Sequence, residues 1–256
     1  MKSNLQNKTL SIIVPCLNEQ GDLEKTINTI TSVIAGAQDI SDFEILIFDD
    51  GSQDQTAAIA DQLARDHKYI RAIHNPQTMG LGHSYREGVK LAKMEYVGWL
   101  PGKNSVPEET LTRMFDAVGQ ADVVLVYILS ESRGYFRRLI SRVFTLLMNL
   151  IFGMRIKYFN GPCIHRRDLL NQTPMTTNGF AFMAEINIRL IKAGFGFVEV
   201  GLHNRDRTQG NSSAFVFRNF LRVLNLISKL FWEIQVKDRL KPESSYRRRY
   251  PVEANG

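Results

Sequence analysis

The sequence is poor in cysteine and has no long apolar run. Its two cysteines, Cys16 and Cys163, form no C-x-x-C pair, which excludes zinc ribbons and disulfide scaffolds. No stretch of 18 uncharged apolar residues occurs, so the sequence does not predict a membrane-spanning helix. Residues 1–8 are polar and lack the apolar core of a signal peptide, and we therefore expect a cytoplasmic location. Internal repeats and low-complexity tracts are also absent.

The composition is that of an ordinary globular protein. Of 256 residues, 44% are hydrophobic and 23% are charged, which excludes disordered and collagen-like classes. Lysine and arginine number 32 against 26 acidic residues, a net charge of +6. This balance favours anionic partners such as nucleotide phosphates, nucleic acid or an anionic membrane surface. No nucleic-acid recognition motif is present, so we do not expect a nucleic-acid partner.

Short apolar runs alternate with amphipathic segments through much of the chain. Strands are predicted at Leu10–Val14, Phe43–Phe48, Ile70–Ile73, Tyr96–Leu100, Asp122–Ile128 and Gly196–Val200. Helices are predicted at Asp22–Ile34, Thr56–Arg65, Gly82–Lys93, Glu108–Val118 and Gly179–Ala193. Such alternation is typical of an α/β fold with a mainly parallel sheet, and right-handed crossovers place helices on both of its faces.

The last part of the chain has a different pattern. Ala214–Val236 has the spacing of a long amphipathic helix rich in Phe and Leu, and the tail that follows is basic and predicted to be flexible. We therefore expect a globular domain over 1–212, an amphipathic helix over 213–236 and a tail over 237–256. The helix could lie on a membrane, pack on its own domain or form a homo-oligomer interface.

Polar clusters follow three of the predicted strands. They are Pro15-Cys16-Leu17-Asn18-Glu19, Asp49-Asp50-Gly51-Ser52-Gln53-Asp54 and Pro101-Gly102-Lys103-Asn104. Ligands of open α/β sheets bind beyond the carboxyl ends of the strands, so we expect the three clusters to converge on one site. An alternative for Asp49-Asp50-Gly51-Ser52 is a plain turn that caps the next helix.

On these residues the chain resembles glycosyltransferase family 2, the inverting GT-A enzymes that use nucleotide sugars. The similarity is strongest to the polyprenyl-phosphate, dolichyl-phosphate mannose synthase-like branch. It covers residues 9–215 and includes Asp49-Asp50-Gly51-Ser52-Gln53-Asp54-Gln55-Thr56 and Gly80-Leu81-Gly82-His83-Ser84. Later matches are Asn160-Gly161-Pro162-Cys163 with Arg166-Arg167, the helix start from Gly179-Phe180 to Glu185, and Arg205 to Gly210 with Ser212.

The resemblance implies a Rossmann-type GT-A fold and a role for each matching residue. Nucleotide-binding residues would be Pro15, Asn18 and Glu19 beside the nucleoside, Asp49 and Asp50 on base and ribose, and Gly80 and Gly82 where the backbone passes the nucleotide. Phosphates of donor or acceptor would meet Arg133, Arg137 and Arg205, and Arg137 and Arg138 would hold an acceptor phosphate. A solvated basic face is the alternative for Arg133 and Arg137, and an ion pair with Asp206 is the alternative for Arg205. Glu185 could be catalytic or a buried anchor for an arginine.

One departure from the family pattern concerns the metal. The family usually carries Asp-x-Asp after the fourth strand, and here that place is Leu100-Pro101-Gly102-Lys103-Asn104-Ser105, without a carboxylate. Mg²⁺ at phosphate sites usually takes one or two carboxylates. We therefore assign no metal ligand, expect weak or absent dependence on Mg²⁺ or Mn²⁺, and expect Lys103 to stabilise the leaving diphosphate instead. An exposed loop lysine and a catalytically inactive site are the alternatives.

Together these observations predict a hexosyltransferase that uses a UDP- or GDP-linked sugar. The expected acceptor is a polyprenyl phosphate, which is already anionic and needs no base. Transfer to a glycan hydroxyl is an alternative that requires a base, with Glu185 or Asp206 as candidates. A non-catalytic nucleotide-sugar-binding subunit is a further alternative. A lipid acceptor would place the protein peripherally on the cytoplasmic face of a membrane.

Overall fold

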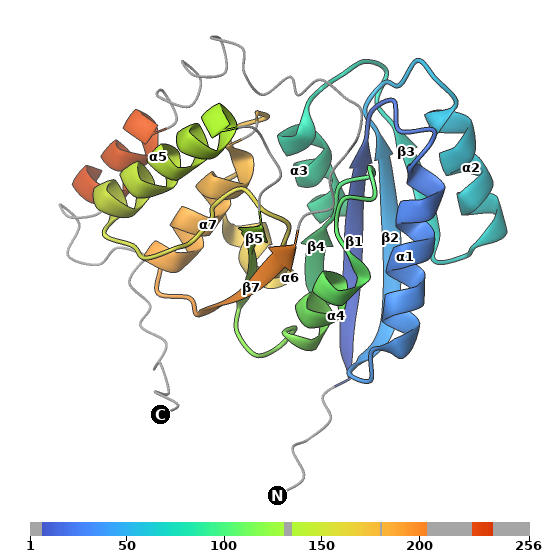
Figure 1. Ribbon diagram of the computed structural model, residues 1–256, viewed down its shortest axis with the longest axis horizontal. Helices are drawn as coiled ribbons and strands as arrows, with labels where there is room; N and C mark the ends of the chain where they lie inside the picture. Colours follow the sequence, from blue (N-terminus) through green and yellow to red (C-terminus); the bar gives the residue numbers. More distant parts are fainter. Residues whose placement is uncertain (1–6, 131–134, 180, 204–226, 238–256) are drawn as a thin grey trace, which may run out of the picture.

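The computed structural model describes residues 7–130, 135–179, 181–203 and 227–237 (Figure 1). Its elements in chain order are β1 (Lys8–Cys16), α1 (Leu23–Gly36), β2 (Ile40–Asp49), α2 (Thr56–Asp66), β3 (Ile70–His74), α3 (Leu81–Leu91), β4 (Tyr96–Trp99), α4 (Glu108–Asp116), β5 (Val123–Ser130), α5 (Tyr135–Phe152), β6 (Cys163–Arg166), α6 (Arg167–Gln172), α7 (Phe182–Lys192), β7 (Phe197–His203) and a π-helical segment, η2 (Phe231–Lys237).

The strands form one mainly parallel sheet in the order β3-β2-β1-β4-β6-β5-β7. Only β6, among the described strands, runs against its neighbours β4 and β5. Helices α1, α2 and α4 cover one face, and α3, α5 and α7 cover the other (Figure 1). The predicted α/β architecture with helices on both faces is confirmed.

The sequence of the strands explains the two layers. In β1, Ile12 and Val14 pack in the cluster under α1 and α4, whereas Ile13 packs in the cluster under α3 and α7. Because alternate residues of a strand point to opposite faces, a strand covered on both sides needs a continuous apolar run. The run in β1 is fully buried from Leu10 to Val14.

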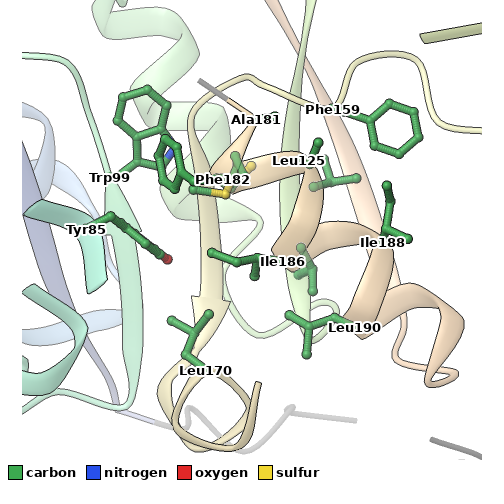
Figure 2. Close-up of a cluster of buried hydrophobic side chains, with 14 of the residues drawn as sticks. Tyr85, Trp99, Leu125, Phe159, Leu170, Ala181, Phe182, Ile186, Ile188 and Leu190 are labelled. Atoms are coloured by element: carbon green, nitrogen blue, oxygen red, sulfur yellow. The ribbon is translucent and has the colours of Figure 1, made fainter. Parts of the chain in front are cut away.

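The core beside α3 and α7 combines aromatic packing with a buried polar chain. The ring centroid of Phe182 lies 5.4 Å from that of Tyr85 and 5.7 Å from that of Trp99 (Figure 2). Asn187 Oδ1 lies 2.9 Å from His165 Nε2, and the other ring nitrogen, Nδ1, lies 3.2 Å from the Tyr85 hydroxyl. Burial lowers the pKa of His165 to about 4, so the ring is neutral at pH 7. It then donates from Nε2 to Asn187 and accepts from Tyr85.

Most predicted elements are present within a few residues of their expected ends, and three segments differ. No element was predicted at residues 135–152, where the structure has the helix α5, and neither β6 nor α6 was expected. The amphipathic helix predicted at 214–236 falls mostly outside the described residues, as does the tail at 238–256. Its described end packs on the domain, because Leu230 and Ile234 are buried in the core beside α5. Within the described ranges, no helix is long and apolar enough to cross a bilayer.

Candidate functional site

The candidate site lies at the edge of the sheet where β1, β2, β3 and β4 end. These strands are parallel, so their carboxyl ends share one edge. The chain builds outward from β1 to β2 and β3, then returns to place β4 on the other side of β1. Such a reversal opens a crevice between the loops, and ligands of open α/β sheets bind there.

The loops that follow β1 and β2 are joined by hydrogen bonds. The backbone N–H of Asn18 donates to Ser52 Oγ at 2.9 Å, and Asn18 Oδ1 accepts from the N–H of Gln53 at 2.8 Å. The N–H of Glu19 donates to Thr56 Oγ1 at 2.8 Å. Asn18 has a φ of 54°, a left-handed conformation that asparagine adopts more readily than most residues. The two predicted clusters therefore form one unit, as expected.

The two aspartates of this unit have different partners. Asp49 accepts from the N–H of Ser52 at 3.0 Å and lies 3.2 Å from His74 Nδ1. Asp50 accepts from the side chain of Asn75 at 2.8 Å and from the N–H groups of Met79 and Gly80 at 2.8 and 2.9 Å. Both aspartates are buried: the exposed fraction is 3% for Asp49 and 6% for Asp50. Asp49 turns the loop after β2, and Asp50 attaches the segment 75–80 to the rim.

Asp54 lies two residues before the helix that follows, α2. Its carboxylate accepts from the N–H of Thr56 at 2.9 Å, at the first residue of α2. Burial acts to raise the pKa of Asp54, but the hydrogen bonds from Thr56 outweigh it and lower the pKa. The turn of the alternative interpretation is present at Asp49, which accepts from the Ser52 N–H, but the N-cap of α2 is Gln55, which makes no side-chain capping bond.

Gly80 and Gly82 lie against the backbone of residues 177–178. A Cβ on Gly82 would come within 2.3 Å of the Thr177 carbonyl oxygen, and one on Gly80 within 2.7 Å of the Asn178 carbonyl oxygen. Gly80 also has a φ of 96°, which disfavours a side chain. The Gly82 N–H donates to the Asn178 carbonyl at 3.1 Å. The close approach of two backbone segments therefore requires glycine at both positions. This requirement is independent of any role of the two glycines in nucleotide binding.

Glu185 holds the segment that meets the glycines. It is fully buried and accepts from the N–H groups of Thr176 and Thr177, both at 3.0 Å. Arg189, one turn along α7, lies 3.2 Å from Glu185 and 2.6 Å from Glu233 of η2. Of the two interpretations of Glu185, the structure supports the buried anchor for an arginine. A base at this position would need an accessible carboxylate, and the carboxylate of Glu185 is not accessible.

The loop after β4 is fixed against β1 and α1. The Leu100 and Gly102 N–H groups donate to the carbonyls of Ile13 and Pro15 at 3.0 and 3.1 Å. The Asn104 N–H donates to Thr26 Oγ1 at 2.8 Å. Lys103 is half-buried between these anchors. The loop therefore reaches the same rim as the other two clusters, as the sequence predicts.

The residues of this loop do not fit a divalent cation bound in the family's usual way. Residues 100–105 contain no carboxylate. Across the described part of the chain, no three His, Cys, Asp or Glu side chains gather closely enough to hold a metal ion. A hard cation at a diphosphate usually takes one or two carboxylates from the protein.

The predicted arginines are only partly visible. Arg133 and Arg205 lie outside the described residues, as does Asp206. Arg137 and Arg138 lie in the first turn of α5, where Arg138 is half-buried and the side chain of Arg137 is outside the description. Because β6 runs antiparallel to both β4 and β5, β5 ends at the same edge of the sheet as β4, two places away from it, and α5 is the next element in the chain.

Three rim residues were assigned no role from the sequence, although Ser84 ends one of the matching segments. His74 ends β3 and bonds Asp49, Asn75 bonds Asp50, and Ser84 Oγ lies 3.3 Å from Asn75 Nδ2. The predicted third strand stopped at Ile73, one residue short. In the structure His74 pairs in register with Asp49, so extending that strand by one residue was the available signal.

Comparison with known proteins places the chain among sugar transferases. The family model of glycosyl transferase family 2 matches residues 11–181. The polyprenol monophosphomannose synthase of Mycolicibacterium smegmatis is 28% identical over 221 residues, which is 78% of this chain and 79% of that protein. The uncharacterized glycosyltransferase EpsJ of Bacillus subtilis is 30% identical over 117 residues, 46% of this chain and 32% of that protein. The chain thus spans about a third of that relative.

Among solved structures, glucosyl-3-phosphoglycerate synthase from Mycobacterium tuberculosis, in complex with UDP, is similar in fold. The TM-score is 0.69 at 16% identity, over 89% of this chain and 83% of that one. At this identity the likeness shows the fold alone. It confirms the GT-A-like architecture that the motifs implied.

Proposed function

The chain belongs to glycosyltransferase family 2, and on that premise we propose that it transfers a hexose from a UDP- or GDP-linked sugar to a polyprenyl phosphate, with inversion at the anomeric carbon. The observation that carries the proposal is the meeting of the loops after β1, β2 and β4 at one rim, joined by hydrogen bonds. The name of the M. smegmatis relative supports this acceptor class.

In the proposed donor site the nucleoside lies against the loops after β1 and β2. Pro15, Asn18 and Glu19 border it, and Asp49 and Asp50 accept hydrogen bonds from its base and ribose. Each aspartate keeps free acceptor capacity, because a carboxylate has about four lone-pair positions and the protein's own donors take two or three of them. The segment with Gly80 and Gly82 passes close to the nucleotide.

The proposed reaction needs no base. An oxygen of the acceptor phosphate attacks the anomeric carbon, and the bond from that carbon to the donor diphosphate breaks with its electron pair on the diphosphate. Lys103 stabilises that leaving charge in place of a metal ion. Arg133 and Arg205 would contact the phosphates, and Arg137 and Arg138 would hold the acceptor. A hydroxyl acceptor would need a base. Of the two candidates, Glu185 is buried and bonded to Thr176, Thr177 and Arg189, and Asp206 lies outside the described residues.

Turnover assays test this reaction. The protein is incubated with undecaprenyl phosphate and labelled UDP-glucose or GDP-mannose, with excess chelator or added Mn²⁺. We expect glycolipid product in chelator and its loss in Lys103→Met, with Lys68→Met, an exposed lysine in a turn, as control. Complete dependence on the metal with full activity of Lys103→Met would refute the role of Lys103. Nucleotide binding without product from any acceptor would favour a binding subunit.

An apolar surface on α5 and η2 supports contact with a membrane. Its residues are Leu139, Ile140, Val143, Leu146, Leu147, Leu150, Phe231 and Trp232, each 44–70% exposed. On α5 they recur at positions of one helix face, and α5 and η2 pack side by side (Figure 1). Exposed apolar patches of this kind mark interaction sites.

The charges around this surface favour an anionic bilayer as its occupant. The α5 sequence contains three arginines and no acidic residue. Arg142, Arg155 and Lys229 are exposed. A basic amphipathic helix with exposed Phe, Leu and Trp can lie in the interface of a bilayer, and each basic residue near an anionic leaflet adds about 1 kcal/mol.

Vesicle flotation tests this contact. We expect binding to phosphatidylglycerol vesicles, weaker binding to phosphatidylcholine vesicles, and loss of binding in the double variant Leu146→Glu, Leu150→Glu. Leu91→Glu, an equally simple change at an exposed leucine ending α3, is the control. Sedimentation without lipid tests the alternative occupant, which is a second copy of the chain. A dimer that the double variant dissociates, with no vesicle binding, would assign the surface to a second copy.

A further inference from the structure

His74 bridges two carboxylates at the edge of the candidate site. Its Nδ1 lies 3.2 Å from Asp49 Oδ2, and its Nε2 lies 3.0 Å from Asp61 Oδ1. Asp49 comes from the end of β2 and is buried, whereas Asp61 comes from α2 and is about half exposed. These are the charged groups that face the ring, one from each element packed against it. His74 itself is 36% exposed, so it exchanges protons with solvent.

The geometry determines the charge of the ring. A neutral imidazole has one N–H and one lone pair, so it can donate to only one of two carboxylates. The second nitrogen would then face an oxygen anion with a lone pair. Only the imidazolium donates to both. Burial acts to lower the pKa of His74, but its bonds to Asp61 and Asp49 outweigh that and raise the pKa above its ordinary value.

We propose that His74 is a positioning residue that, in its charged form, holds Asp49 in place for the donor nucleoside, with Asp61 maintaining that charge. This inference rests on the proposed function, because it takes Asp49 to be a contact of the nucleoside. In the charged state, Asp49 is held at one oxygen by the Ser52 N–H and at the other by His74. When the ring loses its proton, one nitrogen presents a lone pair to a carboxylate, and the second hold on Asp49 is weakened.

The sign of the resulting pH dependence follows. Donor affinity is highest below the pKa of His74 in the folded protein and falls as the pH rises through it. Asp61 affects donor binding only through the ring, since it lies on α2 and bonds the nitrogen opposite to Asp49. Removing its charge makes the imidazolium less stable, so the fall in affinity moves to lower pH by about 0.5–1 unit.

Calorimetric titration with UDP and with GDP from pH 6 to 9 tests the inference. The variants are Asp61→Asn, His74→Ala and His74→Asn, with Asp66→Asn as the matched control, because Asp66 lies on the same helix and bonds only Gln62 among the contacts described. Histidine NMR of the same samples gives the pKa of His74 directly. The ionisation of the nucleotide is common to all variants, so differences between them report on the protein.

We expect Asp61→Asn to shift the midpoint of the affinity change and the NMR pKa together, while Asp66→Asn shifts neither. His74→Ala should weaken binding about tenfold at low pH, the equivalent of one charge-assisted hydrogen bond, and His74→Asn should recover part of it. Nucleotide binding that is identical in Asp61→Asn and the parent at every pH would overturn this inference and leave the proposed function standing. No binding of either nucleotide by the parent would overturn both.

Discussion

Asparagine at position 50 isolates what the carboxylate of Asp50 does for the rim. Asp50 accepts from Asn75, Met79 and Gly80, and an amide has one acceptor oxygen where the carboxylate has two. If that oxygen keeps the bonds to Asn75 and Met79, the new NH₂ group faces the Gly80 N–H. A buried donor left without a partner costs about 1–3 kcal/mol, so we expect Asp50→Asn to lose about 2 kcal/mol of unfolding free energy.

Alanine removes all three bonds. We expect a loss of about 4.5 kcal/mol for Asp50→Ala, since each of the three bonds to the charged acceptor contributes about 1.5 kcal/mol. Because the segment 75–80 is then released from β2, Asp50→Ala should also abolish the thermal shift caused by UDP- or GDP-sugars, which stabilise the folded protein by binding it.

Urea unfolding and nucleotide-induced thermal shifts measure these effects. Asp42→Asn is the control, because Asp42 is an exposed residue of the same strand, β2, and accepts from the N–H of its neighbour Phe43. If Asp50→Asn unfolds within about 0.5 kcal/mol of the parent and binds nucleotide equally well, the carboxylate does not hold the rim together and the reasoning is wrong.

Gly82→Ala should destabilise the fold and abolish donor binding, because the new methyl group meets the Thr177 carbonyl at 2.3 Å; a parent-like melting temperature would contradict this. The buried, neutral His165 should make the protein lose stability as the pH falls. Its pKa is about 4 when folded against an ordinary 6.5, so the unfolded chain binds the proton first and stability falls by about 3 kcal/mol from pH 6.5 to pH 4; urea titrations of His165→Gln should lack that part of the slope. Arg189→Met leaves the buried carboxylate of Glu185 without its cation and should cost about 3–5 kcal/mol, whereas a loss below about 1 kcal/mol in urea unfolding would show that the pair is not needed.

Much of the fold was predictable because its strands are buried on both faces. The run at 43–48, apolar except for Glu44, predicted a strand, and the two aspartates that follow it predicted where that strand ends at the rim. The short strand β6 was not predictable in this way. It contains His165 and Arg166, and the polar chain that buries His165 depends on Tyr85 and Asn187, which are distant in the sequence.

The candidate site, like the fold, was predictable from the sequence only in part. The convergence of Asn18 with Ser52 and Gln53 follows from strand order, which the alternation of elements predicts. Glu185 stands at an otherwise apolar helix start, which suggested a buried anchor for an arginine, and in the structure that arginine is Arg189, at the i+4 position. The contact of Glu185 with Thr176 and Thr177 depends on a loop that folds back over α7, and no local pattern in the sequence encodes that return.

The antiparallel strand β6 has a consequence for biosynthesis. Strands β1 to β4, the last of which ends at Trp99, lie next to one another in the order β3-β2-β1-β4. They can therefore pair as they leave the ribosome. β5 cannot join them directly, because its place beside β4 is taken by a strand that is made about forty residues later, after α5. During that interval β5 and the apolar α5 exist without their partners. A nascent chain whose emerged part ends between residues 130 and 163 should therefore be a strong substrate for chaperones, whereas one whose emerged part ends near residue 107 should already resist proteolysis.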